Sequence, residues 1–354
     1  MNAQLFSPLK LRDITFKNRI AVSPMCMYSA ENGVPNSWHM VHLGSRAVGG
    51  AGLIVVEATG VSPEGRISPG CLGLWNDQQM EAFKPIVSFM KEQGSVAGIQ
   101  LAHAGRKASH SVSWKGSRAL SAQEGGWQVQ APSAIPYSEQ SLLPKEMNSD
   151  DILQLIEDFC ASTQRALNAG FQVIELHMAH GYLMHEFLSP LSNHRQDEYG
   201  GSLENRMRLP LKLVEEVRKI LPMELPLLVR ISATDWAEGG WDLPQSIEFA
   251  KELKKRGVDL VDCSSGGNVP HQKIAVGPHY QVPFAEAIKQ SAGIPTGAVG
   301  LITDPLSAEE ILKSGKADLI FLARELLRDP YWPLHAAKKL GVDIAWPLQY
   351  ERAK

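Results

Sequence analysis

Two histidines and a tyrosine form the densest group of chemically capable side chains in this 354-residue sequence. His177, His180 and Tyr182 directly follow a short apolar run that begins at Val173. Imidazole and phenol groups donate hydrogen bonds and relay protons. Their spacing therefore predicts a site that binds an oxygen atom of a ligand and delivers a proton.

Two other interpretations of the histidine pair remain open. Histidines three residues apart also suit a metal ion, and His185 or Glu186 could supply a third ligand. The segment lacks the glutamate that zinc-protease helices carry between their two histidines. The remaining alternative is that His177 and His180 are structural core residues.

The composition is that of an ordinary globular protein, with 44% hydrophobic and 21% charged residues. A barrel of alternating strands and helices needs about 250 residues or more, so this length suits one barrel with insertions. We find no linker rich in proline and serine and no run of charges that divides the chain. We therefore expect a single domain over residues 1–354.

Charge and cysteine usage exclude several classes of protein. The net charge is −3, from 35 basic and 38 acidic residues, so we expect no attraction to nucleic acid or to an anionic membrane. We find neither the apolar core of a signal peptide nor an apolar run of membrane-spanning length. Cys26, Cys71, Cys160 and Cys263 form no CxxC pair, which argues against disulfide frameworks, zinc ribbons and iron–sulfur clusters. We expect a cytoplasmic protein with reduced thiols and no metal.

Short apolar runs alternate with helical stretches along the whole chain. Asp304 before Pro305 has the pattern of a helix start, and Gly257 and Gly315 have that of positions just past helix ends. Eight strands with helical crossovers predict a closed parallel (β/α)8 TIM barrel of the α/β class, with an open doubly wound sheet as the alternative. The predicted strands are residues 20–22, 53–56, 97–99, 173–176, 227–229, 260–261, 294–296 and 319–322.

One crossover, after the third strand, is too long for an ordinary loop. Residues 104–148 contain several prolines and glycines together with Trp114 and Trp127. Unstructured loops of this length are rare in compact domains, so we expect an insertion that caps the mouth of the barrel. A disordered insertion is the alternative.

Further motifs follow the strands in chain order. They are Ser23-Pro24-Met25-Cys26 with Tyr28, Glu57-Ala58, the run QLAHAGRK at 100–107, His177-x-x-His180-Gly181-Tyr182-Leu183, FLSP at 187–190, YGGSLENR at 199–206, Arg230, Gly297-Ala298-Val299-Gly300 and Ala323-Arg324. In this order, and from Leu5 to Arg352, the sequence resembles the Old Yellow Enzyme family of flavin-dependent ene-reductases. The resemblance is to the bacterial branch that includes thermophilic-like and xenobiotic reductases.

The resemblance implies a tightly bound FMN and places its ring. Negative charge collects near N1 and O2 of a reduced flavin, so Arg230 and Gln100 are expected to contact that edge. A structural ion pair with a carboxylate is the alternative role of Arg230. The backbone of Ser23, Pro24, Met25, Cys26 and Ala58 is expected to border the ring.

The phosphate of FMN is expected after the seventh and eighth strands, where this fold commonly binds phosphate. Val299, Gly300, Ala323 and Arg324 lie there, with Ala323 at a position where the family commonly has glycine. We find no GxGxxG motif followed by an acidic residue, so a Rossmann domain is not expected. NADPH or NADH is expected to enter as a passing substrate.

The resemblance further implies a ping-pong NADPH dehydrogenase that transfers hydride from flavin N5 to activated alkenes, such as α,β-unsaturated carbonyl or nitro compounds. His177 and His180 are expected to bind the substrate oxygen, Tyr182 to protonate the substrate carbon, and Tyr28 to border the substrate. Cys26 is expected to tune the flavin, with simple packing as the alternative. A metal-dependent barrel hydrolase and a flavin-binding module without turnover are the alternative functions.

The C-terminal tail, residues 344–354, is expected to lie at a dimer interface. By the same resemblance, Tyr350 and Arg352 match a Tyr-x-Arg motif whose arginine completes the substrate pocket of a neighbouring subunit. Ala353-Lys354 stand where the family often has an aromatic residue. We expect a homodimer, or a tetramer built from dimers; a frayed terminus is the alternative.

Overall fold

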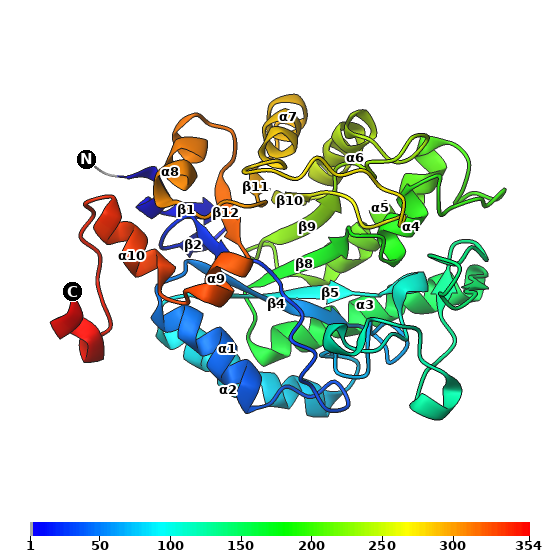
Figure 1. Cartoon of the computed structure of the whole chain (residues 1–354), viewed down its shortest axis with the longest axis horizontal. Coiled ribbons are helices and arrows are strands. Elements are labelled where there is room, and N and C mark those ends of the chain that lie inside the picture. The colour runs from blue at the N-terminus through cyan, green and yellow to red at the C-terminus, as the bar shows by residue number, and fades with distance from the viewer. Residues whose placement is uncertain (1–2) are drawn as a thin grey trace.

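Eight parallel strands close into a barrel in the computed structural model, which describes residues 3–354 (Figure 1). Each strand pairs with its neighbours in chain order, and the last strand pairs with the first. The predicted TIM-barrel class is confirmed, and the open-sheet alternative is wrong. The barrel strands are β3 (Ile20–Val22), β4 (Leu53–Gly60), β5 (Val96–Ala102), β8 (Val173–Met178), β9 (Leu227–Ser232), β10 (Leu260–Ser264), β11 (Thr296–Ala298) and β12 (Leu319–Leu322).

Several strands run further than the apolar runs that predicted them. The ladder between β8 and β9 pairs His177 with Arg230, and the ladder between β5 and β8 pairs Gln100 with Glu175. These polar residues therefore lie within strands and not in the loops after them. The seventh strand begins at Thr296, two residues later than predicted, because Pro295 precedes it and cannot donate to the ladder. Side chains fixed on strands are held more rigidly than side chains on loops.

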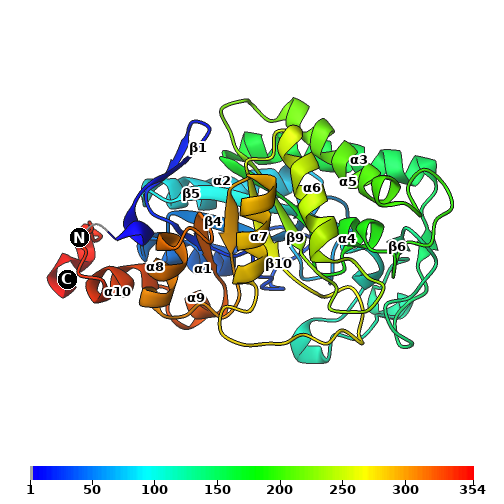
Figure 2. The same cartoon turned by 90° about the horizontal axis from the view of Figure 1, so that it is seen from above.

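Helices cover the outside of the barrel (Figures 1 and 2). Asp304 caps its helix by accepting from Ser307 N–H at 3.1 Å, as predicted. Gly257 and Gly315 lie just past helix ends with φ of +83° and +75°. The helices are α1 (Ser37–Val48), α2 (Asp77–Glu92), α3 (Ser149–Ala169), α4 (Leu183–Leu188), α5 (Leu203–Ile220), α6 (Leu243–Lys255), α7 (Val282–Ala292), α8 (Pro305–Lys313), α9 (Arg324–Arg328) and α10 (Trp332–Lys339).

Apolar side chains fill the barrel interior toward the amino ends of the strands. This cluster includes Val173 of β8, Leu228 of β9 and Leu260 of β10. An antiparallel hairpin, β1 (Leu9–Leu11) with β2 (Ile14–Phe16), adds buried apolar residues to the same cluster. Alternate residues of a strand face the same side, so the next inward positions, further along each strand, carry the polar groups. The interior therefore changes from apolar to polar along the barrel axis.

The insertion at residues 104–148 packs against neighbouring segments through specific contacts. Trp127 Nε1 donates to the carbonyl of Glu64 at 2.9 Å, and the Arg66 guanidinium lies 4.9 Å from the Trp127 ring centroid. The insertion also contains two short strands, β6 (Gln130–Ala131) and β7 (Lys145–Glu146). These contacts disagree with the alternative of a disordered segment.

Within residues 3–354, no helix combines the length and the apolar character needed to cross a bilayer. Cys26, Cys71, Cys160 and Cys263 are all free thiols.

Candidate active site

The three residues singled out by their spacing come together at the carboxyl end of β8. His177 belongs to the strand, His180 lies in the turn that follows, and Tyr182 is the residue before α4. The ring centroids of His177 and His180 are 5.2 Å apart, and those of His177 and Tyr182 are 5.0 Å apart. Both pairs meet edge to face, so the three rings form one cluster.

Burial determines the protonation of this cluster. Burial lowers the pKa of His177 and of His180 well below the ordinary value, and the charge of Arg230 lowers both further. Both imidazoles are therefore neutral at neutral pH, and each has one N–H to donate. Burial raises the pKa of Tyr182 well above the ordinary value, so its phenol keeps its proton. The site combines neutral donors with a protonated phenol.

The metal interpretation lacks the third ligand that it requires. Glu186 Oε1 accepts from the backbone N–H of Arg106 at 2.9 Å. His185 Nε2 lies 2.8 Å from Asp235 Oδ1. Within residues 3–354, no three histidine, cysteine, aspartate or glutamate side chains are grouped so that they could hold a metal ion. The proton-handling interpretation is the one that this geometry favours.

A layer of buried charged groups lies on the strands beside the cluster. Asp262 Oδ2 is 3.0 Å from Arg230 Nε, so the structural ion-pair partner of Arg230 exists. The Nη atoms of Arg230 make no hydrogen bond with residues 3–354, which leaves them available to a ligand. Gln100 Nε2 donates to Glu175 Oε1 at 2.8 Å, which uses one of its two N–H groups. Burial and the charge of Asp262 raise the pKa of Glu175 to about 8.

The ends of β3 and β4 carry two further polar groups, the hydroxyl of Ser23 and the carboxyl of Glu57, together with the thiol of Cys26. A register shift in the pairing of β4 with β5 falls at Glu57 and Ala58, and such irregularities often lie beside active sites. Glu57 Oε2 accepts from Met27 N–H at 3.0 Å. Burial and the nearby Glu57 raise the pKa of the Cys26 thiol. Cys26 therefore remains a neutral thiol, and the buried Ser23 Oγ has no hydrogen-bond partner within residues 3–354.

A cavity of about 220 Å³ lies where the phosphate was predicted, after β11 and β12. All four predicted residues line it, namely Val299, Gly300, Ala323 and Arg324. Gly300 has φ +126°, and a Cβ there would lie 3.0 Å from Gln281 Nε2. Glycine therefore keeps this wall of the cavity open.

A second cavity, of about 420 Å³, lies between the insertion and the barrel. Tyr28 and Tyr182 line it from the barrel side, and Lys107 and Tyr137 line it from the insertion. Trp114 of the insertion meets the Tyr28 ring edge to face at 6.1 Å. The insertion thus forms one wall of a pocket that reaches the Tyr182 ring.

Comparison with known proteins identifies the family of the chain. The family model described as the NADH:flavin oxidoreductase / NADH oxidase family matches residues 4–342. The chain belongs to this family. It is similar to an NADPH dehydrogenase of Geobacillus thermodenitrificans, with 52% identity over 354 residues that cover 99% of each chain. Among solved structures it resembles morphinone reductase, with 28% identity, a TM-score of 0.80, and coverage of 98% of this chain and 92% of that one. It also resembles the old yellow enzyme homologue from Zymomonas mobilis, with 27% identity, a TM-score of 0.78, and coverage of 96% and 94%.

The resemblance to the Old Yellow Enzyme family is therefore confirmed. The protein is a flavin-dependent NAD(P)H oxidoreductase of the NADPH dehydrogenase class.

Arg352 lies apart from the site of its own chain. The tail forms a short 3₁₀ helix, Leu348–Ala353, and Tyr350 packs on Tyr331 with ring centroids 5.8 Å apart. The C-terminus and the insertion lie at opposite ends of the molecule (Figures 1 and 2). Any contact of Arg352 with an active site would therefore be with that of another copy of the chain.

Several residues of the site were not predicted. Tyr280, Gln281 and Arg328 line the 220 Å³ cavity, and Ser264 lies 2.7 Å from His180 Nε2. Glu175 and Asp262 are buried and lie within apolar strand segments. A charged residue in such a segment is a sequence signal that could have identified them as site residues. No spacing in the sequence indicates Tyr280, Gln281 or Arg328.

Proposed function

We propose that this family member binds FMN and uses NADPH or NADH to reduce activated carbon–carbon double bonds of α,β-unsaturated carbonyl or nitro compounds. The observation that carries the proposal is the cluster of two neutral imidazoles and one protonated phenol at the barrel mouth. Such a cluster suits a substrate oxygen on which negative charge develops and a carbon that must receive a proton.

The residues present fit FMN. The 220 Å³ cavity with Arg324 suits a phosphate, because a guanidinium gives charge-assisted hydrogen bonds to phosphate oxygens. Arg230 offers Nη donors and Gln100 a remaining N–H for the N1 and O2 edge of the ring. Ser23 Oγ, buried without a partner, offers a further polar contact. The backbone of Pro24, Met25, Cys26 and Ala58 would border the ring.

FMN, when bound and reduced by NADPH or NADH, would supply a hydride from its N5 position to the β-carbon of the alkene. The chain binds and polarises the substrate oxygen through His177 and His180. His180 can donate from Nδ1 only if its Nε2 accepts from the hydroxyl of Ser264, which lies 2.7 Å away. The neutral state of both rings preserves this pattern of donors and acceptors across the physiological pH range.

Tyr182 holds the proton for the α-carbon of the substrate. The Lys107 Nζ atom lies 5.0 Å from the Tyr182 ring centroid. A cation at that position stabilises the phenolate that remains after the proton has left. Tyr28 borders the same pocket. Cys26, which burial keeps as a neutral thiol, would contact the flavin or the substrate.

A spectroscopic titration tests the function. The purified protein should show flavin absorbance bands, which should bleach on anaerobic addition of NADPH and return on addition of cyclohexenone. Failure of the bands to return would leave a flavin-binding module without ene-reductase turnover. Absence of flavin together with stoichiometric metal would instead favour a hydrolase.

The tail is the basis of a separate proposal about assembly. We propose a homodimer, or a tetramer of dimers, in which Arg352 reaches the active site of the neighbouring subunit. Deletion of residues 350–354 should raise KM for the alkene by about tenfold, the usual effect of losing a hydrogen bond from a charged group, while FMN stays bound. Steady-state kinetics and light scattering measure this effect.

Single substitutions control for general damage to the tail. Arg352→Ala should reproduce the deletion, whereas Lys354→Ala should not, because Lys354 forms an ion pair with Asp343 of its own chain. A fully active monomer would contradict the shared site but would leave the barrel and flavin proposals untouched.

A further inference from the structure

The turn between β8 and α4 has an unusual backbone. His180 and Gly181 both adopt left-handed conformations, with φ of +60° and +70°. A Cβ at Gly181 would lie 2.2 Å from the carbonyl oxygen of Gly267, so the turn is pressed against the loop after β10. Because a non-glycine residue such as His180 rarely adopts this conformation, the surrounding groups must hold it.

Three side chains hold the backbone polar groups of this turn. His180 N–H donates to Ser232 Oγ at 2.9 Å. Lys107 Nζ donates to the carbonyl of His180 at 2.7 Å. Gly181 N–H donates to His185 Nδ1 at 2.9 Å. The last contact is the one that depends on a tautomer, since Nδ1 accepts only when it carries no proton.

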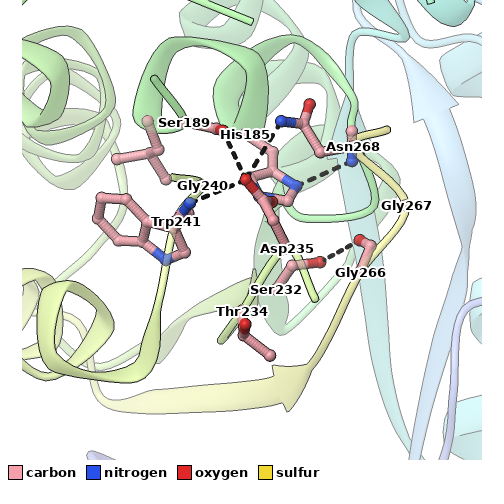
Figure 3. A network of polar contacts seen from close by, with 12 residues as sticks. His185, Ser189, Ser232, Thr234, Asp235, Gly240, Trp241, Gly266, Gly267 and Asn268 are labelled. Atoms are coloured by element: carbon pink, nitrogen blue, oxygen red, sulfur yellow. Dashed lines mark hydrogen bonds and ion pairs between the residues drawn. The ribbon is translucent and has the colours of Figure 1, made fainter. Parts of the chain in front are cut away.

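Asp235 lies at the other end of the His185 ring (Figure 3). His185 and Asp235 are both fully buried, and Nε2 lies 2.8 Å from Oδ1 with a geometry short of a linear hydrogen bond. The other carboxylate oxygen, Oδ2, accepts from Ser189 Oγ at 2.5 Å and from Trp241 N–H at 2.9 Å. Burial raises the pKa of Asp235, but the contacts with His185, Ser189 and Trp241 together lower it below the ordinary value. A carboxylate beside Nε2 favours the proton on Nε2 and leaves Nδ1 free to accept.

We propose that Asp235 is a positioning residue for the reaction, because it fixes the His185 tautomer that holds Gly181 N–H and thereby the His180–Tyr182 turn. The proposal rests on the proposed roles of His180 and Tyr182. The proposed effect of Asp235 on the turn passes through His185, whereas the contacts with Ser189, Trp241 and Asn268 hold the carboxylate itself. The rival role is general stabilisation of the segment around α4.

Asp235→Asn tests the tautomer directly. Three donors point at Oδ2, from Ser189, Trp241 and, at 3.4 Å, Asn268 Nδ2. The oxygen of the new amide should therefore take that place, and its NH₂ should face His185 Nε2. Nε2 must then accept a hydrogen bond, which moves the ring proton to Nδ1. Nδ1 can then no longer accept from the N–H of Gly181, and the two N–H groups face each other. We expect the alkene half-reaction to slow by about 10–100-fold, as when outer partners of functional histidines are replaced. Stopped-flow reoxidation of the reduced holoenzyme measures the rate.

Ser189→Ala is the matched control. It removes one donor to the same carboxylate but leaves the contact of Asp235 with His185, so the melting temperature should fall while the alkene step stays within about threefold of the wild type. If Ser189→Ala slows the alkene step as much as Asp235→Asn does, the role is general stabilisation and the proposal is overturned.

Variants of His185 keep the proposal testable even if Asp235→Asn does not fold. His185→Asn can present its amide oxygen where Nδ1 was, so Gly181 keeps an acceptor and the alkene step should stay within about threefold of the wild type. His185→Leu removes the acceptor and should slow the step by about tenfold or more. Equal rates for the two variants would overturn the proposal.

A double-mutant cycle separates action through His185 from independent effects. Asp235→Asn should slow the wild type but add nothing to His185→Asn, which has no tautomer to fix. An additive loss in the double variant would overturn the proposal. The proposed function fails in a different way, because Tyr182→Phe would then itself leave the alkene step unchanged.

Discussion

Replacing both His177 and His180 with alanine is expected to slow alkene reduction by at least about 10²-fold while FMN stays bound, because loss of one oxyanion donor alone typically costs about 10²–10³-fold. Both rings are neutral donors in the same cluster, so we expect them to act on one substrate oxygen. Single-turnover reoxidation with cyclohexenone measures the loss. Titration with a phenol should show weaker binding, since a phenolic oxygen is expected to take the position of the substrate oxygen.

His194→Ala is a suitable control for the histidine pair. His194 lies on the same stretch of chain after β8, but its side chain is exposed and belongs to no cluster of the site. Its replacement should leave turnover and phenol binding unchanged. Unchanged turnover in the variant that lacks His177 and His180 would contradict the oxyanion role while leaving the family assignment intact.

The barrel was predictable because each strand is a short apolar run that is followed by polar or glycine residues. Parallel strands buried on both sides require such runs, and helix caps such as Asp304 mark the crossovers. The hairpin of β1 and β2 was missed. Each of its strands has three residues, which is too short for alternation to stand out, and only the tertiary contacts of Leu11 and Phe16 show that it belongs to the barrel core.

The predicted site residues are those whose place follows from strand ends. His177, Gln100 and Arg230 converge because the carboxyl ends of neighbouring parallel strands meet at one edge. The residues that position these side chains could not be predicted from the sequence in the same way. Asp235 lies fifty residues beyond His185 in the chain, and no spacing rule relates the two. The roles of such residues emerge only when burial and hydrogen-bond geometry are known.

Tyr182→Phe is expected to slow the alkene half-reaction by about 10²–10⁴-fold, the usual contribution of a positioned general acid. Flavin reduction by NADPH should stay nearly intact, because no proton is delivered to a substrate carbon in that step. The raised pKa of Tyr182 keeps the phenol protonated, so the effect should persist across the neutral pH range. Anaerobic stopped-flow measurement of each half-reaction separates the two rates.

Tyr137→Phe provides the matched control for Tyr182→Phe, because the two tyrosines share a pocket and a cation. Lys107 Nζ lies 4.9 Å from the Tyr137 ring centroid and 5.0 Å from that of Tyr182, and both rings line the 420 Å³ cavity. Loss of a hydroxyl near Lys107 is therefore common to both variants. Only Tyr182 also packs against His177, beside the proposed position of the substrate oxygen. A proton-donor role requires a large loss in Tyr182→Phe alone. Equal losses in both variants, or a greater loss in flavin reduction than in alkene reduction, would show that the hydroxyl serves binding and not proton transfer.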